Sequence, residues 1–79
     1  MYLHIGDEKE IFVDKIICIL NYKSLPNVRK IMDNYRYEIV DISGGDINSL
    51  IIASKTGKKE LIAYLSSIST ETLKKRLYK

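Results

Sequence analysis

The chain has 79 residues, of which 46% are hydrophobic and 29% are charged, and its formal net charge is +3 at pH 7. This balance excludes an intrinsically disordered chain, which would be poor in apolar residues. The single cysteine excludes a disulfide-stabilised secreted scaffold and is typical of a reducing compartment, so we expect a cytoplasmic protein.

The amino-terminal part of the chain predicts three short strands. Residues 2–5 form the first, which ends at Gly6, and residues 11–13 form the second. The third, residues 16–20, consists of five consecutive apolar residues without alternation, a pattern typical of a strand with two buried faces. We expect this strand at the centre of the sheet, with one face on the chain's own helices and the other on a second copy.

A helix and three more strands follow. Ser24 is a candidate helix N-cap and Pro26 lies near the first helical position, so a helix of about ten residues is expected up to Tyr35. Strands are predicted at residues 37–42, 50–53 and 61–65, with turns at 43–46 and 55–59. Ser69 is expected to cap a final helix whose basic residues lie in its last turns, which suits the helix dipole.

The predicted order is β-β-β-α-β-β-β-α, which indicates an α+β fold with a mostly antiparallel sheet and two short helices. We expect a single domain spanning residues 1–79. At this size the apolar area that folding buries contributes about as much free energy as chain ordering costs. The sequence therefore predicts a homo-oligomer, because association is the remaining common source of stability.

The residues that could carry chemistry are isolated. His4 has no orienting partner or nucleophile near it in the sequence, and Cys18 lies inside the apolar run. No cysteine and histidine spacing indicates zinc. The stretch 56–58 resembles a phosphate-binding loop only weakly, and a hairpin tip is the simpler interpretation. We expect no enzyme and no cofactor. The chain also lacks a basic start followed by a long apolar run, so neither a signal peptide nor a membrane partner is expected.

Charge is distributed unevenly. Residues 1–47 contain 6 basic and 8 acidic side chains, and residues 48–79 contain 7 basic and 2 acidic ones. Positive charge in the second half favours an anionic partner such as DNA, whose phosphates several subunits could contact together. The candidate DNA-binding residues of this half form two runs, Lys55, Lys58 and Lys59 in the second turn and Lys74, Lys75 and Arg76 in the last helix.

Three segments resemble a known family. Residues 1–6, the strand at 16–20 and the closing residues 69–76 are similar to the bacterial extracellular-matrix regulators RemA and RemB, and the first and last segments are closer to the RemB branch. The resemblance implies a cytoplasmic, DNA-binding regulator of biofilm matrix genes that forms rings of small subunits. In the RemA branch an arginine precedes the central apolar strand, and Lys15 stands at that place. A proline near the start of the first helix also matches, at Pro26.

One turn departs from the family pattern. The RemA branch has a Gly-Arg-Arg turn where this chain has Gly44-Gly45-Asp46, so a phosphate contact there would become a repulsion. Two hypotheses follow. The first is a ring-like homo-oligomer that binds the DNA backbone through Lys15 and the basic runs. The second is an oligomeric module that binds a protein partner and no DNA. Both place Ile17 and Ile19 in the core or the subunit interface.

Overall fold

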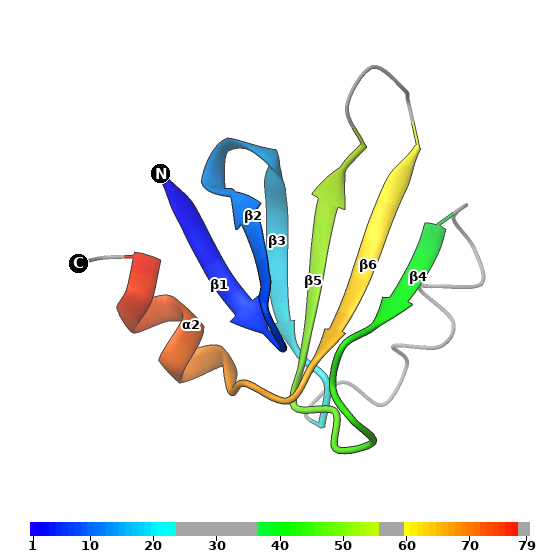
Figure 1. The fold of residues 1–79 in the computed structure, drawn as a ribbon, viewed down its shortest axis with the longest axis vertical. Coiled ribbons are helices and arrows are strands. Elements are labelled where there is room, and N and C mark those ends of the chain that lie inside the picture. Colours follow the sequence, from blue (N-terminus) through cyan, green and yellow to red (C-terminus); the bar gives the residue numbers. More distant parts are fainter. Residues whose placement is uncertain (24–36, 56–59, 78–79) are drawn as a thin grey trace.

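The computed structural model describes residues 1–23, 37–55 and 60–77, which form two sheets and one carboxy-terminal helix (Figure 1). A short 3-10 turn precedes the third strand. The elements in chain order are β1 (Tyr2–Gly6), β2 (Lys9–Phe12), η1 (Val13–Lys15), β3 (Ile16–Asn21), β4 (Tyr37–Asp41), β5 (Ser49–Ser54), β6 (Leu61–Ser66) and α2 (Thr70–Leu77). The six predicted strands are therefore confirmed. The predicted first helix, with Ser24 and Pro26, and the turn residues 56–59 lie outside the described residues.

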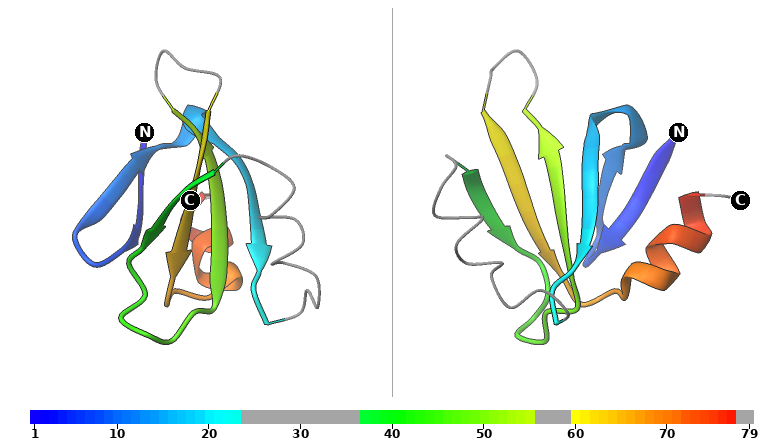
Figure 2. Two further views of the ribbon diagram at one scale, coloured as in Figure 1. Left: turned by 90° about the vertical axis from the view of Figure 1, so that its right-hand side faces the viewer. Right: turned by 180° about the vertical axis from the view of Figure 1, so that it is seen from behind.

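The strands divide into a hairpin and a four-stranded sheet. β1 pairs with β2 antiparallel, and the larger sheet has the order β3-β5-β6-β4. β3 and β6 run antiparallel to β5, whereas β4 runs parallel to β6. The prediction of mostly antiparallel strands is confirmed, with one parallel pair added. The strands form two sheets where one was predicted, and the described residues contain one α-helix where two were predicted. The hairpin lies over one face of the larger sheet (Figures 1 and 2).

The strand predicted to be central is at the edge of its sheet. β3 pairs only with β5 among the described strands, whereas β5 has a neighbour on each side. β5 is buried almost throughout, while no residue of β3 is fully buried and Ile17 is 57% exposed. The prediction of a central strand was wrong. An apolar run indicates that little of β3 should be exposed to water, but it does not indicate which strand lies in the middle of the sheet.

The core fills the space between the hairpin and the larger sheet. Ile5 and Leu73 are fully buried there, and Ile51 and Tyr64 of the larger sheet lie against them. A smaller cluster, built on Leu50 of β5, covers the opposite face of the sheet. Ile19 is partly buried against the first cluster. Ile17 belongs to neither cluster, and the predicted place of both residues in the core or a subunit interface stays a prediction.

Side-chain hydrogen bonds fix the path into α2. The Ser49 hydroxyl donates to the Ile68 carbonyl at 2.7 Å, and the buried Ser66 hydroxyl donates to the Ile5 carbonyl. Ser69 accepts a hydrogen bond from the Thr72 backbone N–H at 3.2 Å, so the predicted N-cap is confirmed. These contacts bring α2 against β1 and β3.

Gly6 supplies the first testable consequence of this packing. It has φ +136°, and a Cβ added there would lie 3.2 Å from the Ser66 hydroxyl oxygen inside the core. We expect Gly6→Ala to lower the free energy of unfolding by about 2–3 kcal/mol, as is typical of a forced, sparsely populated backbone conformation. Urea unfolding followed by circular dichroism measures this loss.

Gly44 provides the matched control for Gly6. It also has a positive φ, +70°, but an added Cβ would meet nothing within 4 Å. Gly44→Ala should therefore cost only the left-handed backbone penalty, about 1 kcal/mol. Equal losses in the two variants would contradict the close packing of Gly6 against Ser66.

Candidate nucleic-acid interface

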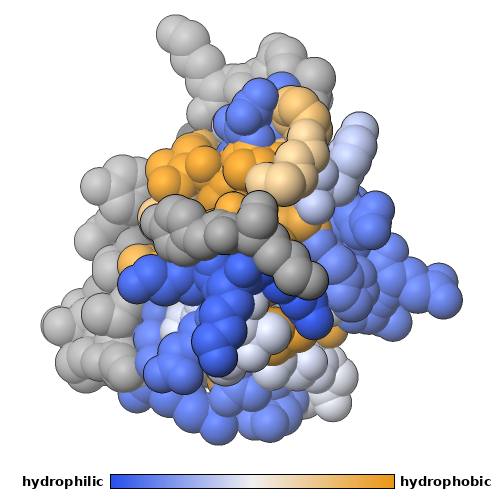
Figure 3. All heavy atoms as spheres, turned by 90° about the vertical axis from the view of Figure 1, so that its left-hand side faces the viewer, coloured by the Kyte–Doolittle hydropathy of each residue, from blue (hydrophilic) through white to orange (hydrophobic). Residues whose placement is uncertain are grey.

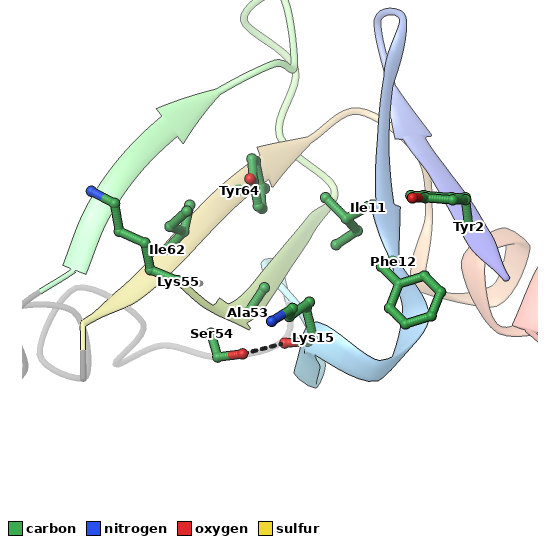
Figure 4. Close-up of a pocket in the computed structure, with 9 residues that line it drawn as sticks. All are labelled: Tyr2, Ile11, Phe12, Lys15, Ala53, Ser54, Lys55, Ile62 and Tyr64. Atoms are coloured by element: carbon green, nitrogen blue, oxygen red, sulfur yellow. Dashed lines mark hydrogen bonds between the residues drawn. The ribbon is translucent and has the colours of Figure 1, made fainter. Parts of the chain in front are cut away.

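Lys15 and Lys55 lie at the same end of the larger sheet. β3 and β5 are antiparallel, so the start of β3 lies beside the end of β5, with Ile16 opposite Ala53. The Ser54 hydroxyl donates to the Lys15 carbonyl at 3.4 Å and joins the two strand ends. Both lysines line one cleft of about 640 Å³ between the hairpin and the larger sheet (Figure 4).

The charges of these two lysines have different surroundings. The Lys55 ammonium donates to the Glu38 carboxylate at 2.8 Å and lies 4.0 Å from a carboxylate oxygen of Glu60. The hydrogen bond and charge of Glu38 raise the pKa of Lys55 above its ordinary value. Lys15 is half-buried, and within the described part of the chain no ion pair or side-chain hydrogen bond satisfies its ammonium. Lys15 is therefore the cation of this pair that remains available to an anion.

The helix residues lie elsewhere on the surface. Lys74, Lys75 and Arg76 are exposed in the later turns of α2. Arg76 donates to the His4 carbonyl at 2.9 Å and lies 3.3 Å from His4 Nδ1, so part of its hydrogen-bonding capacity ties α2 to β1. Lys74 lines a second cleft, between α2 and β3. The predicted basic residues thus form two separate groups, and Lys58 and Lys59 lie outside the described residues.

The turn that departs from the family pattern lies at the opposite end of the sheet from Lys15. It precedes β5, whose first residue, Ser49, is paired with Asn21 at the end of β3. Asp46 forms an exposed ion pair with Lys23 at 3.5 Å. At the end of β4, just before this turn, Asp41 accepts hydrogen bonds from the Ser43 hydroxyl and backbone N–H, which lower the pKa of its carboxyl group. The sequence alone did not indicate that Asp46 and Lys15 lie at opposite ends of the sheet.

Aromatic residues around the cleft were missed by the sequence reasoning. Tyr2 and Phe12 are paired across the hairpin, with ring centroids 5.4 Å apart in an edge-to-face arrangement. Tyr64 lies in the cleft floor, and the Lys9 ammonium lies 5.6 Å from its ring centroid. The signal available in the sequence was the hairpin itself, because pairing residues 2–6 with 9–12 places the two aromatic residues opposite each other.

The described residues contain neither a metal-binding cluster nor a membrane-spanning helix. No group of three or more His, Cys, Asp or Glu side chains lies close enough there to hold a metal ion. Likewise, no helix of the described chain is long and apolar enough to cross a membrane.

Comparison with known proteins identifies the family. The described residues form a small two-sheet fold with Lys15 and Lys55 at one end of the larger sheet. A model of the RemA-like family, described as extracellular matrix regulatory protein A-like, matches residues 2–77. The chain belongs to this family, whose description implies extracellular matrix regulation. No curated protein matches the chain. The resemblance to the RemB branch stays a prediction.

The thiol of Cys18 gives a testable prediction about its rate of alkylation. It is a free, half-buried thiol in β3, and burial raises its pKa above the ordinary value. Because the thiolate is the reactive form, we expect iodoacetamide to modify Cys18 more slowly in the folded protein than in urea at the same pH. Mass spectrometry of timed samples measures both rates. Faster reaction in the folded protein would identify an activated thiol instead.

Proposed function

We propose that the protein is a cytoplasmic, homo-oligomeric DNA-binding regulator of extracellular matrix genes. Family membership supports the regulatory role. The observation that carries DNA binding is the ammonium of Lys15, which stands at the start of β3 with no ion partner among the described residues. Its contacts would be to phosphates, because flexible lysines contact the DNA backbone and carry little sequence information.

Among the described residues, part of the positive charge of one subunit is already engaged. Lys55 is engaged by Glu38, and Arg76 is partly engaged by His4. An assembly repeats Lys15 once per subunit, so its phosphate contacts add and each one steepens the dependence of affinity on salt. Lys74 and Lys75 add exposed charge on α2, and Lys58 and Lys59 belong to the same proposed DNA-binding set.

The two edges of the larger sheet, as the described strands form it, suggest how subunits join. β3 and β4 are its two edge strands, and each carries a strongly exposed isoleucine, Ile17 at 57% and Ile39 at 54%. The strand pairings make β3 parallel to β4. An exposed apolar edge strand is a template for further pairing. Joining β3 of one copy to β4 of the next is a head-to-tail contact, which produces a ring when its rotation closes.

A cleft of about 560 Å³ beside β3 offers additional contact area for the next subunit. It lies between β3 and α2, and Ile17, Ile19 and Leu77 give it an apolar lining. Glu71 and Lys74 stand on its helix side. Apolar surface next to a wide hydrophilic area is also visible on the side of the molecule that carries β1 and α2 (Figure 3). Apolar surface beside charged residues is common in protein interfaces.

DNA binding is tested by gel shift over a series of salt concentrations. For the wild type we expect log K to fall linearly with log salt. Lys15→Gln should reduce the slope by about 0.9 for each Lys15 that contacts a phosphate. Lys23→Gln is the matched control, because it removes the same charge at the opposite end of the sheet, where Lys23 pairs with Asp46. Absence of binding at low salt, or equal slopes in the two variants, would contradict the proposal.

Assembly is tested by light scattering on edge variants. Ile17→Asp should give folded monomers or short oligomers, because an unpaired charge in an apolar interface is costly and Ile17 lies outside both core clusters. Ile19→Asp should instead unfold the subunit, since Ile19 packs against the core. Circular dichroism distinguishes the two results.

Mixing edge variants distinguishes a head-to-tail contact from a symmetric one. Ile17→Asp and Ile39→Asp each damage one of the two edges, so an equimolar mixture should form a heterodimer through the intact pair of edges. A symmetric contact through β3 alone would leave Ile39→Asp fully assembled. A wild-type protein that stays monomeric at micromolar concentration would contradict the proposed assembly altogether.

Asp46 supports a second candidate, a module that binds a protein partner and no DNA. It places an exposed carboxylate in the turn where the RemA branch has arginines. A pull-down from native cytoplasm, analysed with and without nuclease treatment, separates the two functions. Partners retained after complete removal of DNA favour this candidate, and partners lost with the DNA favour the first.

A further inference from the structure

The outer face of the β1–β2 hairpin carries exposed aromatic side chains. Side chains alternate along a strand, so Leu3 and Ile11 point toward the larger sheet and are buried, whereas Tyr2 and Phe12 point the other way. Figure 4 shows the Phe12 ring on the opposite side of β2 from Ile11. Tyr2 and Phe12 are 67% and 37% exposed, and neither belongs to a core cluster. Their edge-to-face pair is therefore an apolar patch that the described part of the subunit leaves open to solvent.

The same hairpin is acidic, although the chain as a whole is basic. Residues 1–14 contain four acidic side chains and one basic side chain. Glu10 of β2 is paired with His4 of β1 and lies on the outer face, and Asp7 and Glu8 are exposed in the hairpin turn. Among the described residues, no ion pair engages these three carboxylates. Their charge repels phosphates, so this face favours a basic protein surface over DNA.

A basic helix lies beside the acidic hairpin. α2 contacts β1 and stands on the side of β1 away from β2 (Figures 1 and 2). Arg76 holds it there by donating to the His4 carbonyl. Lys75 is exposed, and the described residues give it no ion partner. Across this side of the molecule the order is therefore the basic helix, then β1, then β2 with the carboxylate of Glu10.

We propose that the outer hairpin face binds the same face of a second copy through a two-fold contact. Such a contact brings one patch against itself, so the patch needs complementary parts on either side of its centre. A two-fold axis through the aromatic pair brings Tyr2 and Phe12 of both copies together. It also turns the carboxylates of each hairpin toward α2 of the other copy. Aromatic side chains are enriched in interfaces, and opposite charges fix the orientation.

This contact is separate from the proposed contact between sheet edges. It uses neither β3 nor β4, so it would pair two assemblies that the edges have built, or two single subunits where the edges do not join. The patch contains no residue of the proposed DNA-binding set apart from the neighbouring helix charges. Its test can therefore fail while the edge contact and DNA binding stand, and the reverse also holds.

Light scattering on the full-length chain tests the aromatic centre of the contact. Phe12→Ser should at least halve the mass of the wild type, whether or not the edges also join subunits. Circular dichroism should show an intact fold, because Phe12 lies outside both core clusters. An unchanged mass in folded Phe12→Ser, with a lower mass in Ile17→Asp, would overturn the hairpin contact and leave the edge contact standing.

Charge exchange tests the orientation with exposed residues alone, so it stays decisive even if Phe12→Ser fails to fold. Glu10→Lys and Lys75→Glu should each weaken pairing about tenfold, because a two-fold contact then brings like charges together twice. An equimolar mixture of the two variants should regain the wild-type mass, since opposite charges meet again on both sides of the axis. Glu60→Lys is the matched control, a charge reversal beside the larger sheet, and should leave the mass unchanged.

The mixture separates a specific contact from a general effect of net charge. If Glu10→Lys and Lys75→Glu each weaken pairing and their mixture stays weak, the charges do not face each other across two copies and the proposal is overturned. It is also overturned if neither variant changes the mass, or if Glu60→Lys lowers the mass as much as Glu10→Lys does.

Discussion

The structure depends on a strand that has only one neighbour. β3 pairs with β5, and no second described strand covers its outer edge, although five of its six residues are apolar. The subunit covers both faces of β3 incompletely: Ile19 contributes to the core under the hairpin and Leu20 to the smaller cluster on the other face. The side chain of Ile17 is exposed to solvent. An edge of this composition is stable in solution when another surface covers it, so the need to cover β3 favours association.

The same arrangement decides which positive charges are available. The second half of the sequence has a surplus of basic residues, but folding engages part of it: Lys55 is held by Glu38 across the sheet, and Arg76 fastens α2 to β1. Lys15 belongs to the more acidic half, and it keeps its charge free of partners among the described residues. Counting charges along the sequence therefore overestimates the free positive charge at Lys55 and overlooks that at Lys15.

Local features could be read from the sequence, and the relations between distant elements could not. Strand positions followed from apolar runs, and the Ser69 cap followed from its place before a helical pattern. The order β3-β5-β6-β4 depends on pairing of β4 with β6, whose partner residues are 24 positions apart, and of β3 with β5, whose partners are 28 to 37 positions apart. Periodicity gives no information on such pairing. The ion pair between Glu38 and Lys55 and the cleft that joins Tyr2 to Ala53 are consequences of that order. The site was therefore only partly predictable: Lys15 was found, but its aromatic surroundings were not.

Strand direction also bears on the missing arginines of the turn at residues 43–46. Lys15 stands where β3 begins, and Asp46 lies near the opposite end of the same sheet. Since β3 and β4 are parallel, joining them head to tail keeps every copy of the sheet pointing the same way. All copies of Lys15 would then lie on one rim of the proposed assembly and all copies of Asp46 on the other. DNA bound along the Lys15 rim would be a full strand length from the Asp46 carboxylates, a separation over which physiological salt screens much of the repulsion. The acidic turn is thus compatible with phosphate binding at the opposite rim.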